Sequence, residues 1–298
     1  MIQDFPKISI VTPSYNQAAF LDSALQSILS QNYPNLELIV IDGGSTDGSV
    51  EIIKKYEKHL HFWCSEKDQG QYYAINKGFE NSSGEIMSWL NSDDMYYPWT
   101  LKTVSSIMSQ FNQVEWLTSL NAGWWDWHGF NTGFSPLPGF SKDAFLEGRY
   151  VPWSKRQLGW IQQESTFWKR SLWEKVGQTI NINYKLAGDF ELWTRFYKHT
   201  ELFATPSALG GFRSQDQQRS LQKQAYIREA EQALEDMRVS ENWVNNHSKD
   251  LIYKFRLHQL PKIKHYALSS LGYLGKKIIR ENGSSPYGKW EIIPYRFL

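Results

Sequence analysis

The stretch Leu36-Glu37-Leu38-Ile39-Val40-Ile41-Asp42-Gly43-Gly44-Ser45-Thr46-Asp47-Gly48 decides the fold class of this chain. Its first six residues form a short, mostly apolar run, which is typical of a buried strand. The remaining residues are turn formers, and an amphipathic segment at 50–56 follows them. A buried strand that leads through a polar turn into a helix indicates a βαβ unit and a mostly parallel sheet.

The same alternation continues through the first 94 residues. Further strands and helices are predicted at residues 8–12, 21–29, 62–64, 72–79 and 85–90. Polar clusters follow four of the strands, at 13–16, 42–47, 66–71 and 91–94. Because parallel sheets bind ligands at the carboxyl ends of their strands, we expect all four clusters on one rim.

The second half of the chain is less regular. Residues 121–139 are rich in Gly, Trp and Pro and are predicted as a long ordered loop. A strand end and a helix are predicted for 164–176, a helix for 189–198, a strand end for 210–213 and a long helix for 220–237.

Composition limits the classes of function. The net charge of +1 provides no overall field for nucleic acid. The single cysteine, Cys64, allows no intrachain disulfide and favours a reducing compartment. No secretory leader is visible, and no apolar run reaches the ~20 residues that span a bilayer. Aromatic residues reach 15%, with 14 Trp, which suits core packing as well as carbohydrate binding.

Carboxylates lie at the ends of three predicted strands or helices, and two roles are open for each of these sites. Asp42 either accepts a hydrogen bond from a nucleotide base or ribose, or starts an Asp-Gly turn. Asp93 and Asp94 suit Mg²⁺ or Mn²⁺ bridged to phosphates, or a solvated turn before a helix. Asp189, at a predicted helix start, is either a helix cap or a general base for an acceptor hydroxyl. The residues alone leave these alternatives open.

Taken together, the motifs resemble those of glycosyltransferase family 2. The matching segments are 10–17, 38–48, 65–71, 74–78, 84–94, 164–173, 187–193, 212–213 and 218–220. Each motif is short, but their joint order and spacing are specific. The resemblance implies an α/β fold of the GT-A type, with a mostly parallel central sheet flanked by helices. It also implies a nucleotide-sugar donor, Mn²⁺ or Mg²⁺ as cofactor, and inversion at the anomeric carbon.

The resemblance further implies roles for individual residues. Asp189 matches the catalytic base, and Asp93 and Asp94 match the metal ligands. Residues matched to the nucleotide-sugar site are Pro13, Tyr15, Asn16, Asp42, Ser45, Asp68, Gly70, Asn76, Lys77, Asn91, Ser92, Asp93, Arg213 and Gln218. Arg213 and Gln218 fall in the segment that closes over the diphosphate in the family.

Three positions depart from the family's pattern. Asn91 stands where Asp is frequent, Gly188 precedes Asp189 where Glu is frequent, and Gln215 stands where a His that approaches the metal is frequent. Asn91 and Gln215 leave fewer candidate ligands, which puts the tightness of metal binding and the identity of the metal in question.

We expect a GT-A domain over residues 1–220, with a nucleotide-sugar-binding half, 1–120, and an acceptor-binding half, 121–220. Candidates for acceptor contact are Trp124, Trp125, Glu164 and Trp193, together with the Trp-rich segment 153–160, and packing is the alternative role of these Trp residues.

Residues 221–298 are predicted as a helical appendage that is basic and aromatic. Between residues 252 and 298, nine basic residues oppose two acidic ones, a net charge of +7. Such a stretch either lies on an anionic membrane surface or presents a solvated face.

The sequence therefore predicts an inverting, metal-dependent glycosyltransferase. It would move a sugar from a nucleotide-diphosphate sugar, UDP-sugar by default, to a hydroxyl of a glycan or lipid-linked acceptor in cell-surface polysaccharide synthesis. The expected location is the cytoplasm or the inner face of the cell membrane, and no nucleic-acid partner is expected. Two alternatives stay open: a nucleotidyltransferase and a non-catalytic binder of sugar nucleotides. The missing G-x-G-x-x-G fingerprint argues against an oxidoreductase.

Overall fold

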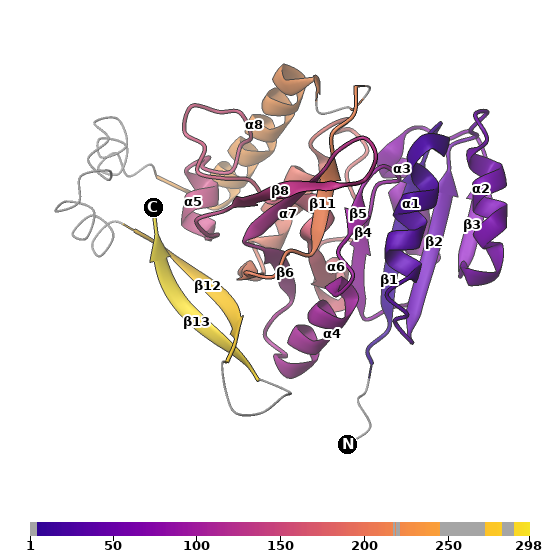
Figure 1. Cartoon of the computed structure of the whole chain (residues 1–298). Coiled ribbons are helices and arrows are strands. Elements are labelled where there is room, and N and C mark those ends of the chain that lie inside the picture. Colours follow the sequence, from indigo (N-terminus) through magenta and orange to yellow (C-terminus); the bar gives the residue numbers. More distant parts are fainter. Residues whose placement is uncertain (1–4, 217, 219–220, 245–271, 282–288) are drawn as a thin grey trace.

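The computed structural model describes residues 5–216, 218, 221–244, 272–281 and 289–298. At its centre lies a nine-stranded, mostly parallel sheet with the order β13-β12-β10-β6-β9-β4-β1-β2-β3 (Figure 1). A smaller four-stranded sheet, β5-β11-β7-β8, lies beside it. The predicted α/β class is confirmed.

The first half of the chain builds one end of the large sheet. Strands β1 (Ile8–Ser14), β2 (Leu36–Asp42), β3 (Phe62–Ser65) and β4 (Ile86–Trp89) pair in parallel, with β1 between β2 and β4. Helices α1 (Ala18–Leu29), α2 (Ser49–Tyr56) and α3 (Gln71–Glu80) connect them, with the 3-10 turn η1 (Glu57–His59) after α2. Every strand and helix predicted for this half is present.

The large sheet separates two apolar cores, which explains the continuous apolar runs of β1 and β2. Successive side chains of a strand point to opposite faces. Ile39 and Ile41 accordingly join the core under α3, whereas Leu38 and Val40 join the core under α1 and α4 (Thr100–Gln110). All four side chains are buried, as a parallel sheet covered by helices on both faces requires.

The second half continues the large sheet with both strand directions. It contributes β6 (Trp116–Ser119), β9 (Phe167–Lys169) and β10 (Phe203–Thr205), and β9 runs antiparallel to both of its neighbours. Between the strands lie α5 (Lys142–Leu146), η2 (Gln163–Ser165), α6 (Arg170–Lys175) and α7 (Gly188–Phe196). The predictions for 164–176 and 189–198 are confirmed within a residue or two.

The predicted loop 121–139 contains a β-hairpin, so that expectation is wrong. β7 (Asn121–Trp125) and β8 (Asn131–Pro136) pair with each other, and β7 also pairs with β11 (Gly210–Arg213), which in turn pairs with β5 (Met95–Tyr96). Gly123, one of the glycines that suggested a loop, leaves room for a side chain to cross the strand, because a Cβ at this position would collide with the Tyr97 hydroxyl.

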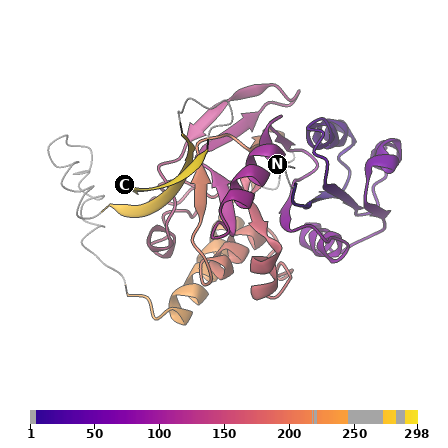
Figure 2. The same ribbon diagram turned by 90° about the horizontal axis from the view of Figure 1, so that it is seen from below.

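The prediction of a helical C-terminal appendage also needs correction. Helix α8 (Lys223–Ser240) is present, but β12 (Tyr273–Arg280) and β13 (Trp290–Phe297) form an antiparallel hairpin that extends the large sheet beside β10. Figure 2 shows this hairpin at the end of the sheet opposite α2. One face of the hairpin packs on the Phe140 segment and the other on α4, so these strands belong to the domain.

Candidate active site

The four polar clusters meet at one rim, as the sequence predicts. The parallel strands β1 to β4 all end at the same edge of the sheet. There the backbone N–H of Asn16 donates to Ser45 Oγ at 2.8 Å, and the Gln71 amide donates to Asn91 Oδ1 at 2.6 Å. Hydrogen bonds thus join the first cluster to the second and the third to the fourth.

Asp42 shapes this rim from inside. Its side chain is fully buried, and Oδ2 accepts from the backbone N–H groups of Gly44 and Ser45 and, at 2.6 Å, from Ser65 Oγ. The Asp42 carboxylate therefore stabilises the Asp-Gly turn, which is the second of the two roles that the sequence left open for it. Among the side chains that stay accessible nearby is Tyr15, 62% exposed.

Asp68 approaches the same turn from the third cluster. A Cβ on Gly43 would lie 3.1 Å from Asp68 Oδ2, so glycine leaves the room for this carboxylate. Gly70 has φ +116°, a left-handed conformation that glycine adopts readily, and it opens helix α3. Lys77 lies farther along α3, where its ammonium pairs with Glu66.

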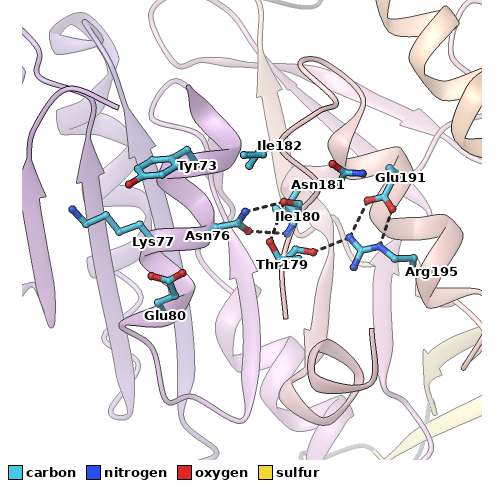
Figure 3. A pocket seen from close by; sticks show the side chains of 10 residues that line it. All are labelled: Tyr73, Asn76, Lys77, Glu80, Thr179, Ile180, Asn181, Ile182, Glu191 and Arg195. Carbon is cyan, nitrogen blue, oxygen red and sulfur yellow. Dashed lines mark hydrogen bonds and ion pairs between the residues drawn. The ribbon is translucent and has the colours of Figure 1, made fainter. Parts of the chain in front are cut away.

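Asn76 lies on another face of α3, toward the segment before α7. Its amide accepts from Ile180 N at 2.7 Å and donates to Ile180 O at 2.8 Å. Both residues line a cavity of about 650 Å³. Figure 3 shows their pair between the other α3 residues of the cavity and Glu191 and Arg195 of α7. Asn76 therefore braces α3 against this segment, and its predicted nucleotide contact has no geometric support.

A smaller cavity, of about 150 Å³, contains Asp189. It is lined by Asn91 after β4, Glu164 of η2, Tyr226 of α8 and Trp153, among others. Asp189 lies in the first turn of α7, where the helix dipole favours a negative charge. Asn91 and Asp189 belong to separate sequence motifs, and the fold brings them to one cavity.

The departure at Gly188 has a steric explanation. A Cβ on Gly188 would lie 2.7 Å from the ring of Tyr72, so a side chain at this position would collide with α3. The Tyr72 hydroxyl in turn accepts from Gly188 N at 2.9 Å. Glycine is the residue that lets α3 approach the start of α7 this closely.

Asp94 and Glu164 form a buried carboxyl pair beside the rim. Asp94 Oδ1 accepts from Arg213 N at 2.9 Å, and Oδ2 accepts from the Asn91 amide at 3.0 Å. Burial, together with the nearby Glu164 and Asp93 carboxylates, raises the pKa of Asp94 well above its usual range. Burial is also the main reason that the pKa of Glu164 is raised, to about 7, with a contribution from Asp189. Near neutral pH the pair therefore retains a proton.

Asp93 is the more accessible of the two predicted metal ligands. It is partly exposed, and its Oδ2 accepts from the amide of Gln215, the residue found in place of the family's frequent His. In the described part of the chain, no group of three or more His, Cys, Asp or Glu side chains is arranged to hold a metal ion. One available carboxylate still fits a cation such as Mg²⁺, which binds through one or two carboxylates plus substrate phosphates.

Arg213, at the end of β11, and Gln218, which follows this strand, brace the site. The Arg213 side chain is 2% exposed, and it donates to Ser23 Oγ at 2.7 Å and to Trp127 O at 3.3 Å. It thereby ties β11 to α1 and to the β7–β8 turn. The side chain of Gln218 accepts from Gln215 N at 3.2 Å, which supports the residue that contacts Asp93.

One predicted acceptor contact is wrong, and two of the others lie within the small sheet. Trp193 is 1% exposed and stacks between Trp89 and Trp116 in the core, so it is inaccessible to a sugar. Trp124 donates to Ser135 Oγ, and Trp125 donates to Met95 O. Glu164 does line the Asp189 cavity, as does Trp153 from the predicted segment 153–160.

Sequence reasoning missed Tyr226 and Gln163, which line the same cavity. Tyr226 belongs to the predicted long helix, but it has no neighbouring motif that distinguishes it from other helical tyrosines. Gln163 donates to Trp89 O at 2.7 Å and lies next to Glu164, so its place beside a matching motif was the available signal.

Comparison with known proteins identifies the family of the first half. Residues 9–132 match the family described as Glycosyl transferase family 2. The chain is 36% identical over 94 residues to the putative teichuronic acid biosynthesis glycosyltransferase TuaG of Bacillus subtilis, covering 30% of this chain and 37% of TuaG. It is 35% identical over 207 residues to the uncharacterized glycosyltransferase RP339 of Rickettsia prowazekii, covering 66% of this chain and 61% of that protein. The chain thus spans less than two thirds of either relative.

Solved structures agree on the fold. S. aureus TarS 1-349 in complex with UDP-GlcNAc aligns with a TM-score of 0.58 at 16% identity, over 89% of this chain and 73% of that one. The mannosyltransferase PcManGT from Pyrobaculum calidifontis, in complex with GDP-Man and Mn²⁺, aligns with a TM-score of 0.53 at 15% identity, over 88% of this chain and 83% of that one. The architecture is therefore that of GT-A glycosyltransferases, and residues 9–132 match the model of glycosyltransferase family 2.

Proposed function

We propose that this protein transfers a sugar from a nucleotide-diphosphate sugar to a hydroxyl group of an acceptor, with inversion at the anomeric carbon. The observation that carries the proposal is the joint placement of the rim and of Asp189. Four polar loops after parallel strands supply the kind of edge at which such sheets bind nucleotides. A cavity with a carboxylate at a helix start adjoins that rim through Asn91.

The proposed chemistry is a single displacement. Asp189 accepts the proton of the acceptor hydroxyl while that oxygen attacks the anomeric carbon. The bond from this carbon to the diphosphate breaks on the opposite face, and the leaving group takes the bonding electron pair. General base catalysis of this kind typically contributes about 10²–10⁴-fold. The remaining acceleration comes from stabilising the charge that develops on the diphosphate.

Asp93 is the residue that would hold a divalent cation together with the donor diphosphate. Such a cation would neutralise negative charge on the leaving group. The Mn²⁺ in the complex of PcManGT supports this part of the proposal by fold analogy. Asp94 is buried, and both of its oxygens accept hydrogen bonds. It would therefore hold the backbone of Arg213 and the side chain of Asn91 in place.

UDP-sugar is the proposed donor class, and a glycan or lipid-linked hydroxyl is the proposed acceptor. The UDP-GlcNAc complex of TarS supports the donor, and the name of TuaG supports a role in cell-surface polysaccharide synthesis. Within the described residues, no helix combines the length and apolar character needed to cross a membrane. Attachment to an anionic membrane through the basic C-terminal segment is a further proposal, although residues 245–271 and 282–288 lie outside the described part. Sedimentation of the full chain with anionic liposomes tests this attachment.

Thermal shift measurements on the full chain test the donor site. The protein is heated with UDP-, GDP-, dTDP- and CMP-sugars, each with Mn²⁺, with Mg²⁺ and with EDTA. A ligand that binds the native state raises its melting temperature by mass action. We expect a UDP-sugar to raise it in the presence of the metal and EDTA to remove the effect. Absence of a shift with every donor would contradict the proposal and favour a non-catalytic member of the family.

Product analysis separates the remaining enzyme class. A glycosyltransferase releases a nucleoside diphosphate from the donor, whereas a nucleotidyltransferase releases pyrophosphate from a nucleoside triphosphate. Detection of pyrophosphate from UTP and a sugar phosphate, with no nucleoside diphosphate from any donor, would overturn the proposed reaction.

A further inference from the structure

Helix α8 presents two polar side chains to the start of α7. Tyr226 and Glu229 are three residues apart and therefore lie on one face of α8. The Tyr226 hydroxyl donates to the Asp189 carboxylate and lies 3.2 Å from Oδ1 and 3.4 Å from Oδ2. Both distances are long for this type of bond, as is common for catalytic hydrogen bonds before substrate binds.

Glu229 holds the backbone that leads into α7. Its Oε1 accepts from Lys185 N at 3.1 Å, and its Oε2 accepts from Leu186 N at 2.8 Å and from Ala187 N at 2.9 Å. These are donors at and just before the first turn of a helix, which otherwise lack intrahelical partners. A carboxylate bonded to three backbone N–H groups fixes the path of residues 185–187.

Tyr72 of α3 forms hydrogen bonds with the same segment. Its hydroxyl donates to Leu186 O at 2.7 Å and accepts from Gly188 N at 2.9 Å. The residues before Asp189 are therefore held between α3 and α8. Of these two helices, α8 is the one whose Tyr226 contacts the carboxylate itself.

The surroundings of Asp189 give the hydrogen bond from Tyr226 an electrostatic role. Glu164 of η2 lies close enough to interact electrostatically with Asp189, and a second negative charge disfavours ionisation of both. A hydrogen bond from Tyr226 favours the ionised form of Asp189. Burial, and then the negative charge of Asp189, raises the pKa of the Tyr226 phenol well above its usual range, so the phenol keeps its proton at neutral pH.

We propose that Tyr226 and Glu229 are positioning residues for the base: Glu229 fixes the backbone before Asp189, and Tyr226 orients its carboxylate and keeps it ionised. This inference rests on the proposed function, because it assigns a purpose to α8 only if Asp189 accepts the acceptor's proton. It makes α8, which lies outside the matched family segment 9–132, part of the catalytic arrangement.

Amide hydrogen exchange tests the Glu229 contact without any substrate. In the full chain, Glu229→Gln removes the charge that strengthens three backbone hydrogen bonds, so we expect exchange in peptides covering 185–189 to accelerate roughly tenfold or more. The matched control is Glu231→Gln, an exposed glutamate on the same helix. Equal exchange in both variants would overturn the proposal.

The pH dependence of turnover tests Tyr226, with the donor found by thermal shift and release of nucleoside diphosphate as the readout. We expect Tyr226→Phe to move the acid limb about one pH unit higher and to lower turnover about tenfold, with an unchanged KM for the donor. The matched control is Tyr197→Phe, because that buried hydroxyl of the segment after α7 has no hydrogen-bond partner within the described residues.

The outcomes separate this inference from the proposed function. If Tyr226→Phe keeps the rate and the pH profile of Tyr197→Phe while Asp189→Asn loses turnover, the role of α8 is refuted and the proposed function stands. If Asp189→Asn itself keeps normal turnover, the base assignment fails, and the inference fails with it.

Discussion

Asp189 is the side chain on which the proposed chemistry depends most. Asparagine keeps its shape and can still accept from Tyr226, but it takes up no proton. We therefore expect Asp189→Asn to lower turnover by about 10²–10⁴-fold. The thermal shift with donor should stay as in the parent chain, because the rim loops are untouched. A variant that turns over normally, or one that loses donor binding as well, would contradict this role.

Glu37 is a buried carboxylate that accepts several hydrogen bonds but lies outside the candidate site. Burial by itself would raise its pKa, but hydrogen bonds from Ser83, Ser9 and Lys7 lower the pKa to about 2. A carboxylate with a depressed pKa in the folded state stabilises the protein above its unfolded pKa, and this stabilisation is lost as pH falls toward 2.

We expect Glu37→Gln to lower the free energy of unfolding by on the order of 2–3 kcal/mol at pH 7, and by about half as much at pH 3. Urea denaturation at both pH values measures this difference. Glu80→Gln, at an exposed glutamate, serves as the control and should change little. An equal loss of unfolding free energy at both pH values would show that the charge of Glu37 does not cause the destabilisation.

At single residues the sequence predicts which polar groups reach the rim, but not where each side chain points. The ends of parallel strands fix the place of Asp42 and Asp93, and both are found there. The direction of Asn76 depends on the segment around Ile180, far away in sequence, which no local pattern specifies. Trp193 belongs to a core of tryptophans that forms only when α7 packs on the sheet.

Among the elements, those of the first half follow from the sequence because β1, β2 and β4 bury contiguous runs and α1 to α3 bury residues at helical spacing. The β7–β8 hairpin escapes prediction because its strands contain glycines at 123 and 133 and pair with β11, whose position comes from the tertiary fold. The C-terminal hairpin escapes for a related reason. Its alternation mixes Lys277 and Arg280 with Ile278, and the charge pattern resembles that of a solvated helix.

A buried polar group connects this hairpin to the chain before it. Arg149, 1% exposed, donates from Nε to the Tyr273 hydroxyl at 3.0 Å and from Nη2 to Glu147 at 3.2 Å, and the Tyr273 hydroxyl also donates to Glu147. A buried charge pair tolerates poorly the loss of a hydrogen-bond partner.

We expect Tyr273→Phe to lower the free energy of unfolding by about 1–3 kcal/mol, since it leaves polar atoms of Arg149 and Glu147 without one partner. Tyr295→Phe, on the partner strand, removes a buried hydroxyl that has no hydrogen-bond partner in the described residues, and it should cost little. Chemical denaturation of both variants measures the contrast. Equal stability of the two variants would show that the Tyr273 hydroxyl adds nothing to the link.

The whole molecule combines a first half that matches the family over residues 9–132 and a frame built by residues beyond 132. The rim is formed by loops of the first half. The cavity at Asp189 needs η2, α7 and α8, and the small sheet holds Asp94 through Arg213. Sequence reasoning located the first part well because its determinants are local, whereas the frame depends on contacts between distant segments.

The C-terminal hairpin should therefore be indispensable to the frame, which truncation can test. A chain that ends at residue 244 loses β12 and β13, including the buried side chains of Ile278 and Phe297, and exposes the edge of β10 beside them. It also leaves Arg149 and Glu147 without Tyr273. The truncation removes buried apolar surface and a partner of a buried charge pair. We expect the free energy lost in this way to exceed the net free energy of unfolding of a typical domain.

We expect the truncated chain to be insoluble, or to bind a hydrophobic dye and to lack a cooperative thermal transition, although the hairpin lies at the far end of the sheet from β3. Circular dichroism during heating, compared with the full chain, measures this. A truncated chain that melts cooperatively at the same temperature would show that the strands are a dispensable extension, as the predicted appendage would be. In that case the frame of the candidate active site would have to be stabilised by α5, α7 and α8 without the sheet extension.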